Sequence, residues 1–161
     1  MNQRAQVLQK IRSIPALPAA SSAVAELLRD PEVEIDDVVR AIEFDQSLTS
    51  NVLRLANSAY FAGPRTIGSV RDAVVRLGMN RIFQLVIMTA ITPMVREEVH
   101  GYDLAPGKLL EHYIAVAVGA EELALELKLH PPLYTFTAGL LHDIGKVVLG
   151  TFLEADAESI L

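Results

Sequence analysis

Apolar residues recur along this chain at spacings of three and four, which is the period of one face of an α-helix. The segment DQSLTSNVLRLANSAY gives the clearest example, with apolar positions at Leu48, Val52, Leu55, Ala56 and Ala59. Asp45 stands just before it, with a side chain able to accept hydrogen bonds from free backbone N–H groups. The pattern therefore predicts a helix that Asp45 caps.

Further short helices are predicted on both sides of this segment. SVRDAVVRLG begins with Ser69, has Asp72 three residues later and closes at Gly78, a weaker form of the capping box with a glycine end. PAASSAVAELLRD and IDDVVRAIEF predict two more helices, separated by a turn at Asp30–Pro31. The opening MNQRAQVLQKIRSIP has the pattern of an amphipathic polar helix and lacks the apolar core of a signal peptide.

The second part of the chain is also helical in its spacing. Residues 108–129 form the longest uninterrupted helical stretch, which ends before Pro131–Pro132. LYTFTAGLLHDIGKVVLG and TFLEADAESIL follow it. The β-branched runs VVRL and KVVL both lie within helical spacing, so helix is favoured and no convincing strand is found. The pattern predicts an all-α domain of roughly eight or nine helices.

The chain is expected to be one domain, residues 1–161, built from two sections. Residues 1–98 form an N-terminal bundle of short helices, HGYDLAPGK reads as a connecting loop, and residues 106–161 form a part that holds the histidines. The sequence stops at AESIL, inside a helix-compatible stretch without a cap or polar tail. This ending predicts that the chain is a fragment of a longer protein, truncated within its second section.

Composition narrows the class of protein. Of the 161 residues, 51% are hydrophobic, which argues against disorder, and none is cysteine, which excludes disulfides and cysteine metal sites. The formal charge of −6 argues against nucleic-acid binding through bulk charge. The apolar stretch IFQLVIMTAITPMV is too short for a membrane span of roughly 20 residues and contains Pro93, so it predicts a buried core helix. We expect a soluble cytoplasmic protein without a membrane segment.

The candidate chemistry lies with the histidines. His142 and Asp143 are adjacent, in the run AGLLHDIGKVVLG, with Leu140, Leu141 and Ile144 as apolar neighbours. His112 lies on or near the apolar face of the long predicted helix, four residues before Val116. The remaining two, His100 and His130, stand beside Gly101 and Pro131 and are expected at the surface.

Two imidazoles and a carboxylate suit a first-row divalent metal ion. Adjacent residues on a helix point about 100° apart, so His142 and Asp143 can line one cavity only if a neighbouring helix brings His112 opposite them. A histidine on an apolar face can instead be a hydrogen-bonded core residue with Asp143 as its partner. Spacing alone leaves both interpretations open.

Three landmarks, taken in order, resemble the HDOD domain, the HD-related output domain of bacterial signalling proteins. They are the prolines Pro15 and Pro18, the stretch EFDQSLTSNVLRLANSAYF, and AVVRLGMNRI. The ending GLLHDIGK, preceded by a histidine about 30 residues earlier, resembles the signature of the wider HD superfamily of metal-dependent phosphohydrolases. The resemblance covers essentially the whole chain and implies an HD-like helical fold.

In catalytic HD proteins the positions that match His112, His142 and Asp143 bind metal, and a further aspartate completes the site. For this chain the resemblance implies a possible divalent ion, which would be Mn, Fe, Mg or Zn. The further aspartate is not evident, because Asp156 follows Asp143 more closely than the family spacing, so this ligand is expected either to lie beyond residue 161 or to be absent. Lys146 matches a lysine that handles phosphate in the cyclic-dinucleotide phosphodiesterase branch, and it could equally be an exposed helix residue, which we favour. HDOD domains keep some of these residues and are generally regarded as regulatory.

Three functions compete at this point. The first is a regulatory signal-transduction module of the HDOD type, without hydrolytic activity, that contacts a protein partner or fused signalling domain. The second is a metal-dependent phosphohydrolase acting on a nucleotide or cyclic dinucleotide, with Lys146 as a catalytic residue. The third, a DNA-binding helix-turn-helix, is based only on the segment VRDAVVRLGMNRIF. It is the weakest of the three, because a turn of that kind is common in helical proteins. We favour the first, with His112, His142 and Asp143 as a candidate metal site that is inherited by descent and either still binds an ion or is vestigial.

Overall fold

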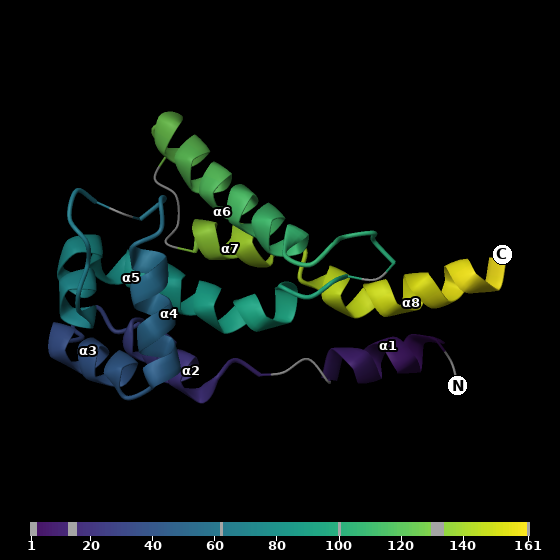
Figure 1. Cartoon of the computed structure of the whole chain (residues 1–161), viewed down its shortest axis with the longest axis horizontal. Coiled ribbons are helices and arrows are strands. Elements are labelled where there is room, and N and C mark those ends of the chain that lie inside the picture. Colours follow the sequence, from purple (N-terminus) through teal and green to yellow (C-terminus); the bar gives the residue numbers. More distant parts are fainter. Residues whose placement is uncertain (1–2, 13–15, 62, 100, 130–133, 161) are drawn as a thin grey trace. The chain divides into compact units, whose positions relative to one another are not determined.

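The structure, a computed structural model, describes residues 3–12, 16–61, 63–99, 101–129 and 134–160, and the regular secondary structure of these residues is helical (Figure 1). In chain order the helices are α1 (Gln3–Arg12), α2 (Ala19–Leu27), α3 (Ile35–Glu43), α4 (Gln46–Ala56), α5 (Val70–Val95), α6 (Lys108–Glu126), α7 (Thr135–Leu141) and α8 (Gly145–Ile160). Within the described ranges no strand forms, and an isolated bridge joins Val99 to Leu104 in the loop before α6. The all-α fold class is confirmed, including helix for VVRL and KVVL.

The chain divides into two compact units, one of residues 17–91 and one of residues 1–16 with 92–161. The sequence analysis placed residues 1–98 together and put the boundary at the loop that follows. In the structure, residues 1–16 and 92–98 belong instead to the unit that holds the histidines. The reason for the first difference is that α1 packs against α8. The reason for the second is that α5 continues as helix across residue 91, so the boundary falls inside a helix that has no loop to mark it.

The unit of residues 17–91 packs α3 against both α2 and α4. Asp45 caps α4 as predicted, since its carboxylate accepts a hydrogen bond from the backbone N–H of Leu48 at 2.8 Å. The predicted apolar face of α4 is correct up to Ala56, which is fully buried. It is wrong at Ala59, which is exposed and lies in the turn after the helix. The helix ends early because the side chain of Asn57 accepts and donates hydrogen bonds within the following loop.

Gly78 breaks α5 into two helical segments, as the sequence predicted. Its φ of 78° and ψ of 164° lie in a region that is essentially reserved for glycine. Ser69 caps the first segment by accepting from the backbone N–H of Asp72 at 3.0 Å. The second segment is the predicted core helix, with Ile82 and Leu85 fully buried.

By length and composition α5 is also the one helix among the described residues that could cross a membrane. Half of its most apolar window is buried inside the protein, however, as in the core helix of a folded domain. Its apolar character is therefore accounted for by packing.

In the other unit, α6 and α7 form the closest helix pair. Gly139 on α7 meets the backbone of α6 so closely that a Cβ built on Gly139 would lie 2.8 Å from Cα of Ala117. Tyr113 on α6 and Phe136 on α7 are almost completely buried. The absence of a side chain at Gly139 thus lets the helix that carries His112 approach the helix that leads to His142.

Candidate metal centre

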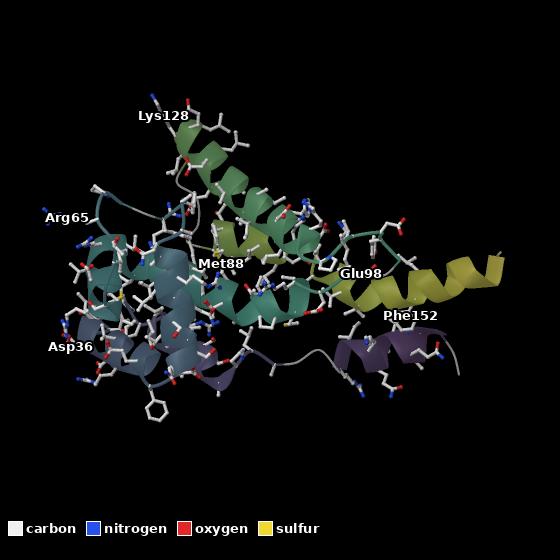
Figure 2. The ribbon with its side chains drawn as sticks, viewed as in Figure 1. Asp36, Arg65, Met88, Glu98, Lys128 and Phe152 are labelled. Atoms are coloured by element: carbon white, nitrogen blue, oxygen red, sulfur yellow. The ribbon has the colours of Figure 1, made fainter. Side chains whose placement is uncertain are left out.

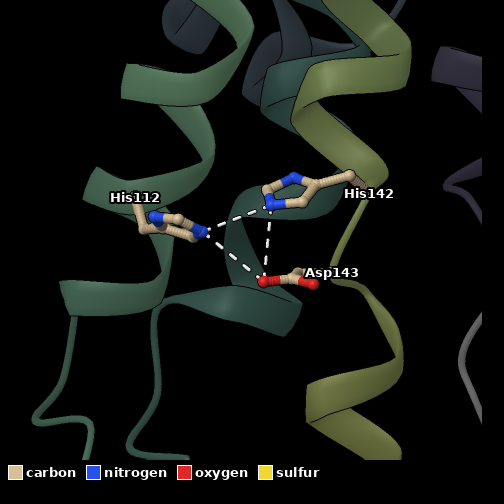
Figure 3. Close-up of side chains that lie close together, drawn as sticks. All are labelled: His112, His142 and Asp143. Atoms are coloured by element: carbon tan, nitrogen blue, oxygen red, sulfur yellow. Dashed lines mark hydrogen bonds and ion pairs between the residues drawn. The ribbon is translucent and has the colours of Figure 1, made fainter.

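Two helices and a helix break bring the three candidate ligands together. His112 projects from the first turns of α6, and His142 caps the C-terminus of α7. Residues 142–144 form a turn between α7 and α8, so Asp143 does not continue the helix that ends at Leu141. This turn removes the 100° constraint that applies to neighbours on one helix, and both side chains face His112 (Figure 3).

The ligand atoms form a nearly equilateral triangle. Nε2 of His112 lies 3.2 Å from Nε2 of His142, and Oδ2 of Asp143 lies 3.4 Å from each of these two nitrogens. Within the described part of the chain this is the group of histidine and acidic side chains that is arranged to hold a metal ion. The structure therefore brings together all three residues that the sequence singled out.

The size of this triangle fits a divalent ion. Zinc bonds of about 2.0–2.1 Å in tetrahedral geometry separate neighbouring ligand atoms by about 3.3–3.4 Å. The three observed separations, 3.2, 3.4 and 3.4 Å, are close to that value. Three protein ligands would occupy three corners of a tetrahedron and leave the fourth corner accessible.

The orientation of His142 also fits a ligand. Its Nδ1 lies 2.7 Å from the backbone carbonyl oxygen of Gly139, so Nδ1–H donates to this acceptor. That tautomer leaves the lone pair of Nε2 directed at the triangle, the usual arrangement for a metal-binding histidine. In the same tautomer, Nε2–H of His112 donates to Nε2 of His142. The imidazole of His142 is held in place before any ion arrives.

The three side chains are partly open to solvent. Their exposed fractions are 46% for His112, 34% for His142 and 30% for Asp143. The predicted burial around His142 is correct for Leu140, which is fully buried, whereas Leu141 and Ile144 are only partly buried. An ion in solution could therefore reach the triangle without unfolding the helix pair.

Lys146 belongs to this cluster, and the expectation that it is simply an exposed helix residue is corrected. Its ammonium forms an ion pair with Oδ2 of Asp143 from one turn further along the chain, and the side chain is 30% exposed. Its Nζ also lies 5.8 Å from the centre of the Tyr102 ring, within reach of a cation–π contact. The hydrogen bond from Lys146 lowers the pKa of the Asp143 carboxyl; partial burial opposes this, and His142 and His112 add to it.

The other basic and acidic candidates lie elsewhere or outside the described residues. Lys108 pairs with Glu111 at 2.7 Å at the start of α6. His100 and His130 lie outside the described residues, and so does the side chain of Asp156.

Tyr113 is a member of this neighbourhood that the sequence interpretation missed. Its ring centre lies 5.8 Å from that of His142, and its side chain is fully buried. Burial raises the pKa of the Tyr113 hydroxyl, and the charge of Asp143 raises it further. The signal was present in the sequence, because Leu109, Tyr113 and Ala117 follow one another at intervals of four and mark the buried face of α6.

Comparison with known proteins confirms the resemblance to the HDOD domain that the sequence segments indicated. Residues 14–161 match the HDOD domain. The chain belongs to the HDOD family. The match covers both compact units, the loop between α4 and α5 and the HDIGK segment.

Solved HDOD-like structures share the fold. An HDOD domain protein of unknown function from Geobacter sulfurreducens is 31% identical, with a TM-score of 0.74 over 91% of this chain and 49% of its own. A protein from Shewanella amazonensis, provisionally named a phosphohydrolase, is 33% identical, with a TM-score of 0.73 over 97% of this chain and 55% of its own.

A third structure, from Marinobacter aquaeolei, is provisionally named a signal transduction protein and is 25% identical, with a TM-score of 0.67 over 95% of this chain and 38% of its own. An uncharacterized protein from Treponema pallidum is 25% identical over 89% of this chain and 28% of its own length. The HDOD chain described here therefore spans about half the length of these relatives, or less.

Proposed function

We propose that this HDOD chain is a regulatory signal-transduction module that acts through contacts with a partner protein or a fused signalling domain in the cytoplasm, without hydrolytic turnover. One observation carries the proposal. The two lysines within four residues of the candidate ligands in the sequence are both paired with carboxylates, Lys146 with Asp143 and Lys108 with Glu111. A hydrolase acting on a phosphate ester needs positive charge aimed at the developing negative charge of the transition state.

In this proposal the triangle of His112, His142 and Asp143 is an ion-binding site with a structural role. The two imidazole nitrogens and the carboxylate would hold a divalent ion, which when bound would cross-link α6 to the turn between α7 and α8. Asp143 supplies the one carboxylate of the triangle, and Lys146 offsets its charge. Because Lys146 shares Oδ2 with the site, ion binding has to displace this ion pair.

A metal-dependent phosphohydrolase is the second candidate, favoured by the separations within the triangle and by its open side. A bound divalent ion can lower the pKa of water and polarise a phosphoryl oxygen. Three protein ligands with a fourth position open are typical of catalytic zinc sites. The provisional name of the Shewanella amazonensis relative belongs to that protein and gives this alternative its direction.

Metal content and turnover, measured together, separate the two functions. The purified chain is incubated with Mn²⁺, Zn²⁺ or Fe²⁺, desalted, and analysed for metal by mass spectrometry. The same samples are assayed with bis(p-nitrophenyl) phosphate and with a cyclic dinucleotide. We expect close to one ion per chain, lost in His142→Ala, and no turnover above buffer with either substrate.

His100→Ala is the matched control, because it removes a histidine that is not one of the three candidate ligands. It should retain the ion. Turnover that requires the metal and disappears in His142→Ala would overturn the regulatory proposal in favour of the hydrolase. Failure of any ion to bind would instead leave His142 and Asp143 as polar groups held by Gly139 and Lys146, respectively, and would remove the structural role proposed for the ion.

A further inference from the structure

A second concave site lies in the unit of residues 17–91, on residues that take no part in the histidine cluster. The loop between α4 and α5 and the first segment of α5 line an open cavity of about 560 Å³. This volume falls within the range of about 300–1,000 Å³ that is usual for small-molecule sites. Phe61, Ile67 and Leu77 provide apolar wall, and Arg65 and Arg76 provide guanidinium groups.

The loop that forms one wall is fixed by the side chain of Asn57. The amide oxygen of Asn57 accepts from the backbone N–H of Ile67 at 2.8 Å, and its amide nitrogen donates to the carbonyl oxygen of Ile67 at 3.0 Å. The same nitrogen donates to the carbonyl oxygen of Leu53, one turn back in α4, at 2.8 Å. The two ends of this loop, ten residues apart, are thereby held together by the side chain of Asn57, and a preformed cavity costs less free energy to fill.

Arg76 spans the cavity and is held at two points. Its Nε pairs with the carboxylate of Asp72, one turn earlier in α5, at 2.5 Å. Its Nη1 donates to the backbone carbonyl oxygen of Arg65 at 3.2 Å. The guanidinium is therefore positioned before binding, and its second terminal nitrogen remains to donate to a ligand.

Arg65 extends from the loop toward solvent (Figure 2), and it is one of the residues that line the cavity. Arg65 and Arg76 bring two positive charges to the cavity, and Asp72, the carboxylate paired with Arg76, brings one negative charge. A net positive site on a chain whose formal charge is −6 is selective for a small anion, because a long polyanion would meet the acidic remainder of the surface. Guanidinium groups match the geometry of phosphate oxygens.

We propose that this cavity binds a small organic phosphate that carries a flat, largely apolar ring, of the nucleoside monophosphate class. The phosphate lies between the guanidiniums of Arg65 and Arg76, and the ring lies against Phe61, Ile67 and Leu77. The inference goes beyond the proposed regulatory role, since it concerns a different unit and different residues. A ligand here would give the module an input that is separate from any ion at the histidines.

The test is a titration of the ¹⁵N-labelled chain with AMP, followed by two-dimensional NMR. We expect saturable shifts concentrated on the amides of the loop 57–67 and of residues 76–77. Adenosine lacks the phosphate and loses its charge-assisted hydrogen bonds, and inorganic phosphate lacks the ring and loses its apolar contacts. Each should therefore bind at least about tenfold more weakly than AMP. Saturable binding of AMP with both deficits supports the assignment.

Two arginine substitutions distinguish the cavity from general charge. Arg65→Gln should weaken AMP binding by about five- to tenfold, because it removes one charged donor at an exposed position without disturbing the fold. Arg71→Gln makes the same change of charge on α5 at a residue that pairs with Asp36 and does not line the cavity, so binding should be unchanged. His142→Ala should also bind AMP normally, which separates this inference from the fate of the metal site.

Three results would overturn the assignment. They are no saturable shift with AMP, equal losses in Arg65→Gln and Arg71→Gln, and inorganic phosphate binding as tightly as AMP. The second would indicate attraction to charge in general, and the third an anion site without a ring pocket.

Discussion

Lys146 and Asp143 are the residues whose pairing most affects the chemistry of the cluster. The carboxylate oxygen that faces both imidazoles, Oδ2, is the same oxygen that accepts from Lys146. A positive charge at this point keeps Asp143 ionised, which helps a metal site, and competes with a cation for the same oxygen, which opposes it. Replacement of the lysine separates these two effects.

Lys146→Met should therefore raise the pKa of Asp143 toward its ordinary value, because the hydrogen bond that lowers it is lost. At neutral pH the carboxylate stays ionised and is free of its partner, so affinity for Zn²⁺ or Mn²⁺ should rise by up to roughly fivefold, the scale of a partly exposed ion pair. Titration of the Asp143 carboxyl carbon by NMR measures the pKa, and calorimetry measures the affinity. Lys108→Met, whose lysine pairs with Glu111, is the matched control and should change neither.

A weaker affinity in Lys146→Met would mean that the lysine supports the site rather than competing with it. If the parent chain shows phosphodiesterase turnover, its loss in the same variant would point to the phosphate-handling role that the family resemblance implies.

The sequence predicted which residues make the site but not how they face one another. His112, His142 and Asp143 followed from residue type and from the HD signature, and all three meet in the structure. The turn at residues 142–144 could not be predicted from periodicity, because the apolar spacing continues across it and no glycine or proline stands between Gly139 and Gly145. The partner of Lys146 depends on that turn, and so its pairing with Asp143 was missed as well.

At the scale of elements, the geometry of the cluster depends on how closely α6 and α7 approach. The contact between Gly139 and Ala117 sets this distance, since the nearest atoms to a Cβ at Gly139 all belong to the backbone of α6. Backbone atoms cannot rotate away as the end of a side chain can. The separation between His112 and His142 is thus fixed by a residue that contributes no ligand.

Gly139→Ala should push α7 away from α6 and lower the free energy of unfolding by about 1–3 kcal/mol, the usual cost of overpacking a core. It should also abolish or weaken metal binding, because the triangle of ligand atoms would open. Gly119→Ala is the matched control on α6, where a Cβ meets nothing within 4 Å. That change should stabilise the helix by about 0.5–1 kcal/mol.

Urea unfolding of both variants checks the prediction, with metal content measured alongside. Equal stability of the two alanine variants would show that α6 and α7 can separate without cost and that Gly139 does not set their distance.

Helix ends were predicted where a side chain or glycine marks them in the sequence. Asp45, Ser69 and Gly78 each behave as their residue types imply. Ala59 was assigned to a helix because apolar spacing continues past Ala56, whereas the hydrogen bonds of Asn57 divert the chain into a loop. Asparagine at that point is a weak signal, and its partner Ile67 is ten residues away, so the loop could not be inferred from local pattern.

At the scale of the whole molecule, the two compact units share one chain but differ in what they bury. The unit of residues 1–16 and 92–161 places Tyr113 at full burial beside the metal candidates, and its hydroxyl has no hydrogen-bond partner among the described residues. A buried polar group without a partner costs free energy. It also links stability to alkaline pH, because the ionised form is excluded from this environment.

In the unfolded chain Tyr113 ionises near pH 10, while in the folded chain burial holds its pKa higher. Between these pH values the unfolded state has lost a proton that the folded state retains, so stability falls as the pH rises above about 10. Tyr113→Phe should be neutral or stabilising by about 1 kcal/mol at pH 7 and should show a shallower loss of stability at high pH. Thermal unfolding of the metal-free protein between pH 7 and 11 measures both, with Tyr134→Phe, an exposed tyrosine, as control.

A steeper alkaline loss in Tyr113→Phe than in the parent chain would mean that this hydroxyl is not the group that couples stability to pH.

The turn that separates α7 from α8 has a mechanical consequence. His142 closes one helix and Asp143 precedes the next, so an ion held by both, together with His112 on α6, would be sensitive to the angle between three helices. Binding and angle are then thermodynamically coupled, and the coupling is reciprocal. Any contact that bends α8 away from α7 would loosen the ion, and loss of the ion would release α8 to take a new direction.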